Sequence, residues 1–206
     1  AYLFSKICIE AGVPPGVINI VHGLGEVVGE EIVKHGSVPV ISFTGGTKTG
    51  KRIAKISSEK FKKISLEMGG KNPNIVFADA DLKKAVNWAV KASFLNQGQI
   101  CLCGSRLFVQ ESIYNDFKLA IIKESNGLKV GDPKDENSNL GAVVSKEHLE
   151  KILSCIERAK EEGGEILTGG KRLMLDGELK GGYYVEPTII EGLTVDCQTN
   201  REEIFG

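Results

Sequence analysis

A cysteine and a glutamate, each next to glycines, are the residues of this 206-residue chain that point most directly to chemistry. Cys101 lies in the stretch FLNQGQICLCGSRLFVQ, between a predicted helix and a predicted strand, with Gly98 and Gly104 close by. Glu67 ends the apolar stretch ISLE and is followed after one residue by a Gly-Gly pair. A thiol and a carboxylate at such positions predict a nucleophile and a general base for covalent catalysis.

A glycine-rich turn, GGTKTGK at residues 45 to 51, follows one predicted strand and precedes a predicted helix. Its backbone amides and the positive end of the helix suit a phosphate group. The turn almost matches the GxxxxGK loop of nucleotide hydrolases, but Arg52 stands where Ser or Thr would hold magnesium. We therefore reject the hydrolase loop and keep two interpretations, a phosphate-binding turn and an ordinary strand-to-helix turn.

The elements that must position these residues alternate between helix and strand with short connections, which predicts an α/β fold with parallel sheets covered by helices. The glycines at 69 and 70 can absorb a turn between two sheets, so we expect two domains, over residues 1–69 and 70–206, that meet at a cleft with Glu67 and Cys101 on opposite sides. The expected strands are residues 17–21, 38–43, 63–68, 74–78, 106–110 and 181–190. The expected helices are residues 1–12, 25–35, 51–60, 82–94, 113–123 and one beginning after Ser145.

Composition excludes several classes of partner. Lysine and arginine total 26 against 27 aspartates and glutamates, with no basic stripe, so we expect no nucleic acid. No apolar run approaches the roughly 20 residues of a membrane helix, so we expect no membrane partner. Five irregularly spaced cysteines predict reduced thiols and a cytoplasmic protein. Three scattered histidines and a Cys-x-Cys pair, instead of Cys-x-x-Cys, predict no metal site.

Three motifs together resemble the aldehyde dehydrogenase superfamily, and they occur in the family's order. The glutamate motif reads LEMGGKNP at residues 66 to 73, and the cysteine motif reads Phe94, then Gly98-Gln99-Ile100-Cys101. A third motif, REEIFG at residues 201 to 206, is similar to the family's Glu-Glu-Ile-Phe-Gly-Pro. The resemblance covers essentially the whole chain and implies the family's fold.

For the chemistry, the resemblance implies oxidation of an aldehyde to the carboxylic acid with NAD(P)⁺. Cys101 would add to the carbonyl and pass through a thiohemiacetal and a thioester, and Glu67 would activate the hydrolytic water. The backbone N–H of Cys101 would donate to the oxyanion. Taken alone, each residue has an ordinary interpretation, a buried small residue for Cys101 and a surface charge at a strand end for Glu67.

For the cofactor, the resemblance implies NAD, with NADP as an alternative. Gly45, Gly46 and Gly50 would lie at the pyrophosphate, although Gly46 replaces the serine of many members and so removes one hydroxyl. Glu203 would bind the hydroxyls of the nicotinamide ribose, and Phe205 would pack beside the nicotinamide ring.

The resemblance also implies a small aldehyde as the partner, and a homodimer or homotetramer when the protein is full length. The glycine turn favours the branch that acts on 2-aminomuconate semialdehyde, retinal or betaine aldehyde. Family members are more than twice this long, so we expect an incomplete cofactor domain and catalytic domain, and no activity from these 206 residues alone. The alternatives are an inactive member that serves as a binding or structural protein and, more weakly, a cysteine hydrolase, for which no histidine lies in a fitting motif.

Overall fold

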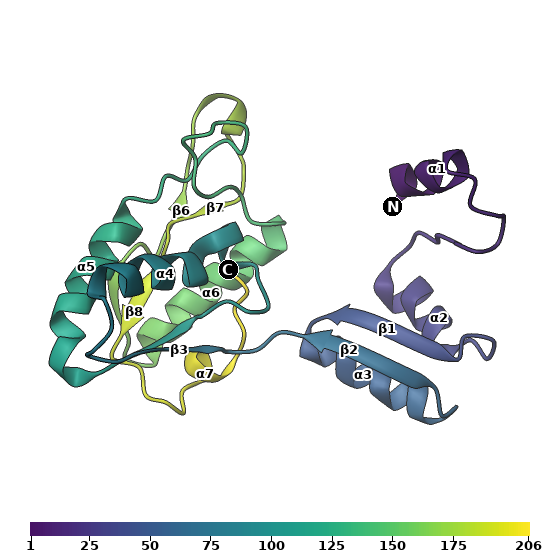
Figure 1. Cartoon of the computed structure of the whole chain (residues 1–206), viewed down its shortest axis with the longest axis horizontal. Coiled ribbons are helices and arrows are strands. Elements are labelled where there is room, and N and C mark those ends of the chain that lie inside the picture. Colours follow the sequence, from purple (N-terminus) through teal and green to yellow (C-terminus); the bar gives the residue numbers. More distant parts are fainter. The chain divides into compact units, whose positions relative to one another are not determined.

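The computed structural model describes residues 1–206 and contains two compact units, Ala1–Met68 and Gly69–Gly206 (Figure 1). Each unit combines helices with two-stranded sheets. None of the helices is both long enough and apolar enough to cross a lipid bilayer.

The first unit is built on a parallel pair of strands, β1 (Val40–Gly45) and β2 (Lys63–Met68), joined through helix α3 (Thr47–Ser58). The register is continuous along all six residues of each strand, and α3 lies over one face of the pair (Figure 1). A small apolar core forms between this pair and the helices that precede and follow β1. Its buried members are Val33, Ile41 and Ile53.

Before β1 the chain forms α1 (Tyr2–Glu10) and then a π-helical turn, Gly25–Gly29, that continues into α2 (Glu30–Lys34). The expected strand at residues 17–21 is wrong, because this segment has no strand partner in the structure. Within these 206 residues no other element covers its apolar side chains, and Val17 is 67% exposed. An apolar run becomes a strand only where a second strand satisfies its backbone.

The second unit contains the other parallel pair, β3 (Pro73–Val76) and β4 (Arg106–Val109), connected by α4 (Leu82–Phe94). Helix α5 (Tyr114–Asn126) follows β4 and packs against α4. Asp81 caps α4, since its Oδ1 accepts a hydrogen bond of 3.0 Å from the backbone N–H of Lys84. The core of this layer consists of Val76, Val86, Ala89, Val90, Phe117 and Ile121. Parallel pairing was expected from the alternation of helices and strands, and both parallel pairs confirm it.

The remaining strands of the second unit pair in antiparallel fashion, and the sequence predicted this region only in part. Helix α6 (Lys146–Glu161) begins at the Ser145 cap and packs on a second core of Val143, Leu149, Ile152 and Ile156. The antiparallel pairs join β5 (Glu165–Thr168) to β8 (Ile189–Glu191) and β6 (Arg172–Leu173) to β7 (Tyr184–Val185). The short helices are η2 (Leu95–Gly98), η3 (Glu111–Ile113), η4 (Gly177–Leu179) and α7 (Gln198–Arg201).

The single strand expected at residues 181–190 is wrong, because the structure divides it into β7 and β8, which belong to different sheets. Pro187 lies between them and has no N–H to donate to a ladder. The two pieces therefore pair with different partners.

Candidate active site

The segment that connects α4 to Cys101 has a strained backbone. Asn96 and Gln97 both have positive φ angles, 52° and 59°, in a region that side-chain-bearing residues seldom occupy. The Gln97 side chain is fixed at both ends, because it accepts from the Gly141 N–H (3.1 Å) and donates to the Ala142 carbonyl (3.3 Å). Such strain persists only where the surroundings hold it, and it concentrates at functional sites.

Cys101 lies at the surface of a tight turn that is closed by a 2.9 Å hydrogen bond from the Cys103 N–H to the Ile100 carbonyl. The N–H of Cys101 donates to no group of the chain. Its carbonyl accepts a 2.8 Å hydrogen bond from the Asn72 side chain. The turn therefore presents an accessible thiol beside a free backbone donor, which is the combination that addition to a carbonyl requires.

Cys103, two residues later, has a different environment. Its thiol donates to the Ser93 carbonyl at 3.2 Å and is half-buried. Burial raises the pKa of the Cys103 thiol, and the nearby Lys71 ammonium only partly opposes this. Of the two neighbouring thiols, Cys101 is therefore the accessible one and Cys103 the packed one. All five cysteines are free, and no group of three or more His, Cys, Asp or Glu side chains could hold a metal ion.

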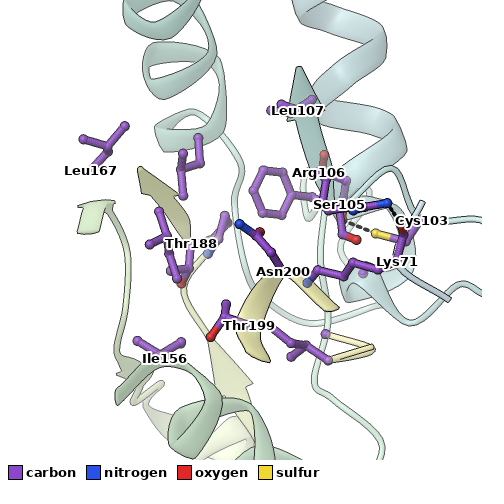
Figure 2. A pocket seen from close by; sticks show the side chains of 18 of the residues that line it. Lys71, Cys103, Ser105, Arg106, Leu107, Ile156, Leu167, Thr188, Thr199 and Asn200 are labelled. Carbon is purple, nitrogen blue, oxygen red and sulfur yellow. Dashed lines mark hydrogen bonds between the residues drawn. The ribbon is translucent and has the colours of Figure 1, made fainter. Parts of the chain in front are cut away.

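A cavity of about 420 Å³ opens inside the second unit. Figure 2 shows Lys71, Cys103 and Arg106 at one end of it, and apolar side chains such as Ile156 and Leu167 on other elements. Burial lowers the pKa of the Lys71 amine. The Arg106 side chain donates to the Lys71 carbonyl at 2.6 Å, which ties the glutamate motif to β4.

Glu203 also lines this cavity, and it lies against the start of the same motif. Its Oε1 atom is buried and has no hydrogen-bond partner. A β-carbon added to Gly69 would overlap the Glu203 carboxylate, so a larger residue there would displace it. A buried carboxylate oxygen without a partner is an acceptor that a ligand hydroxyl would satisfy.

Two residues that the sequence analysis missed hold the backbone around Glu203. Lys151 donates to the carbonyls of Glu203 (3.3 Å) and Ile204 (2.9 Å), and His148 Nε2 lies 2.7 Å from the Phe205 carbonyl oxygen. Phe205 has a φ of 68°, and its ring meets the His148 ring edge-on at 6.1 Å. Their spacing of three residues places His148 and Lys151 on one face of α6, but the spacing does not reveal which segment they contact.

In the first unit, Glu67 lies in β2 opposite Thr44 of β1, and its side chain is exposed. Cys101 belongs to the other unit, so the pairing of these two side chains stays a prediction.

The glycine turn is shorter than expected, because α3 begins at Thr47 instead of residue 51. Gly45 ends β1, and Gly46 is the N-cap of α3, with open space where its β-carbon would be. The first turn of α3 has no acidic residue and no side-chain cap, so its amides face no internal anion. Gly50 lies inside the helix, where its amide donates to the Gly46 carbonyl and a β-carbon would overlap the Met68 sulfur. Its structural contribution is close packing.

Comparison with known proteins decides the family. All 206 residues match the sequence model described as "Aldehyde dehydrogenase family". The chain belongs to this family. The 2-aminomuconic semialdehyde dehydrogenases of Mus musculus and Homo sapiens are 48% and 46% identical to it over 208 residues, which cover 100% of this chain and 43% of each relative. This family assignment confirms the resemblance in the three motifs.

The fold comparison agrees with the family assignment. A crystal structure of betaine aldehyde dehydrogenase from Staphylococcus aureus, in complex with NAD⁺, superimposes on the chain with a TM-score of 0.95 at 42% identity. The match covers 98% of this chain and 40% of that structure. The expected aldehyde dehydrogenase fold is therefore confirmed, and the chain spans less than half the length of the relatives it matches.

Proposed function

We propose that the whole protein oxidises an aldehyde to the carboxylic acid with NAD⁺ as the hydride acceptor, NADP⁺ being the alternative. The observation that carries the proposal is the exposed thiol of Cys101, beside its own free N–H, in a chain of the aldehyde dehydrogenase family. The solved relative in complex with NAD⁺ supports the choice of cofactor.

The chain's own residues would act in a fixed order. The Cys101 thiolate adds to the aldehyde carbon, and the Cys101 N–H donates to the oxyanion of the resulting thiohemiacetal. When bound, NAD⁺ supplies the acceptor for the hydride whose loss converts the thiohemiacetal into a thioester. Glu67 then removes a proton from water, the water oxygen attacks the thioester carbon, and the carbon–sulfur bond breaks to release the acid and the Cys101 thiolate.

The residues present fit a dinucleotide. The unpartnered Oε1 atom of Glu203 is an acceptor suited to ribose hydroxyls, and Phe205 offers an aromatic wall for the nicotinamide ring. The uncapped N-terminus of α3 suits a pyrophosphate, and the open space beside Gly46 allows close approach of the backbone. We assign residues 1–69 to the NAD(P)-binding domain and residues 70–206 to the catalytic domain.

For the substrate, we propose a small aldehyde of the semialdehyde type. The support is the set of 2-aminomuconic semialdehyde dehydrogenases among the relatives, with betaine aldehyde as the second candidate. We further propose that the enzyme is homo-oligomeric and that it is cytoplasmic; the five free cysteines support the second part, because reduced thiols are typical of that compartment.

A spectrophotometric screen of the whole protein tests this function. The protein is mixed with NAD⁺ or NADP⁺ and a panel of 2-aminomuconate semialdehyde, betaine aldehyde, retinal and acetaldehyde, and formation of the reduced cofactor is followed. We expect turnover with at least one semialdehyde and a preference for NAD⁺. Absence of turnover with every aldehyde and both cofactors would favour a binding or structural role for this family member.

A further inference from the structure

Asn72 contacts the cysteine turn but has no part in the chemistry outlined above. Its side-chain nitrogen lies 2.8 Å from the Cys101 carbonyl oxygen and 3.1 Å from the Cys103 carbonyl oxygen. An amide nitrogen carries two hydrogens, so one side chain serves both carbonyls. No other side chain donates to either of them.

The backbone of Asn72 is itself fixed. Its carbonyl accepts a 3.2 Å hydrogen bond from the Arg106 N–H at the start of the β3–β4 pair, and Pro73 follows with a restricted φ. Asn72 therefore holds the turn from a position beside the sheet, where its own backbone is hydrogen-bonded. We call its two side-chain hydrogen bonds the clamp.

We propose that Asn72 is a positioning residue that holds Cys101 in the geometry from which its thiol attacks the aldehyde; this rests on the function proposed above. The Cys101 thiol is exposed, so contacts of its own side chain do little to fix it. Peptide groups are planar, and anchoring the Cys101 carbonyl fixes the orientation of the peptide plane that follows the nucleophile. Without Asn72, neither backbone polar group of Cys101 would keep a hydrogen-bond partner, although Cys103 would retain its hydrogen bonds to Ile100, Ser93 and Ser105.

Two substitutions in the whole protein remove the clamp in different ways. Asn72→Leu removes both donors without adding charge, and Asn72→Asp keeps the shape but turns an acceptor toward two carbonyls. Asn74→Asp is the matched control, because Asn74 is partly buried two residues later, in β3, and makes no hydrogen bond to the turn. Misplacing a reacting atom by about 1 Å costs on the order of 100-fold in rate. We therefore expect kcat to fall roughly 10- to 100-fold in both Asn72 variants, with KM for the aldehyde within about threefold, and kcat of the control within about twofold.

Amide hydrogen exchange gives a second readout that does not need activity. Exchange should become faster in the peptide that covers residues 95–104 of both Asn72 variants, while peptides from α4 keep the wild-type rate and so report an intact fold. A wild-type kcat in Asn72→Leu, or unchanged exchange in this peptide, would overturn the proposal. If the wild-type protein oxidises no aldehyde, the proposed function fails by itself, and the exchange comparison alone decides whether Asn72 holds the turn.

Discussion

The carboxylate of Glu203 lies against the α-carbon of Gly69, at a point where a β-carbon would overlap it. This contact links the terminal motif to the glutamate motif within one unit. Gly69→Ala should push the carboxylate out of place and weaken the hydrogen bonds to the cofactor ribose that we propose for it. We expect KM for NAD⁺ to rise about tenfold, which corresponds to the loss of about one charge-assisted hydrogen bond.

The neighbouring glycine provides the control for that experiment. A β-carbon on Gly70 would meet nothing within 4 Å, so Gly70→Ala introduces the same methyl group without displacing Glu203. Steady-state kinetics at varied NAD⁺ should give a wild-type KM for Gly70→Ala. Equal KM values for the two alanine variants would contradict the assigned role of the Gly69 contact.

Lys151 should support the cofactor site without touching the substrate. Its amine donates to two carbonyls of the terminal motif, so Lys151→Met should loosen the backbone that carries Glu203 and Phe205. We expect KM for NAD⁺ to rise roughly ten- to thirtyfold, since each of the two lost hydrogen bonds contributes about 1 kcal/mol. Lys146→Met, an exposed lysine of the same helix that pairs with Glu150, is the control and should leave KM unchanged.

Tyr114 should make the free energy of unfolding decrease at high pH. Burial, together with its hydrogen bond to the Glu191 carboxylate, raises the pKa of Tyr114 to about 12. A raised folded-state pKa means that the neutral phenol stabilises the fold fully below its ordinary pKa of about 10, and that this stability is lost as the pH rises through about 12. Tyr114→Phe should therefore lower the free energy of unfolding by about 1 kcal/mol near neutral pH, and the difference from wild type should shrink above pH 10.

Urea unfolding at a series of pH values, with ultraviolet absorbance to follow tyrosinate, measures this effect. Tyr2→Phe serves as the control, because Tyr2 is 63% exposed and its hydroxyl makes no hydrogen bond. A stability difference for Tyr114→Phe that stays constant up to pH 12 would show that the phenol does not titrate as assigned.

Removing the carboxylate of Glu67 should separate the two halves of the reaction. If Glu67 activates the hydrolytic water, Glu67→Gln still forms the thioester but releases it slowly, by roughly 100- to 10,000-fold for a lost general base. Acid quenching followed by mass spectrometry should then find the acyl group on the peptide that carries Cys101. Glu59→Gln, an exposed glutamate at the end of α3, should accumulate none. Failure of Glu67→Gln to accumulate acyl-enzyme while turnover continues would remove Glu67 from this role.

Sequence patterns predicted the fold where structure is determined locally. The apolar runs that became β1 to β4, the Ser145 cap and the glycine turn before α3 each follow from a few neighbouring residues. The errors arose where distant partners decide. Residues 17–21 have the composition of a strand but no strand beside them, and the short ladders of β5 and β6 depend on partners that lie 11 to 26 residues later in the chain.

The candidate site likewise contains residues that local motifs reveal and contacts that only the fold creates. Cys101 and Glu67 lie in short motifs that a single sequence reveals. The environment of Cys103, the burial of Lys71 and the clamp made by Asn72 depend on residues about 30 positions apart that only the fold brings together. His148 and Lys151 were missed for the same reason, because each lies more than 50 residues from the carbonyls it holds.

The role of Cys101 as the nucleophile is tested most directly by comparing two cysteine substitutions two residues apart. Cys101→Ser and Cys103→Ser remove one thiol each from the same turn, and formation of NADH from NAD⁺ and an aldehyde accepted by the wild-type whole protein is measured for both. We expect Cys101→Ser to lose at least about a thousandfold in kcat, while Cys103→Ser keeps activity within about tenfold of wild type. Retained activity in Cys101→Ser, or a loss confined to Cys103→Ser, would show that Cys101 is not the nucleophile.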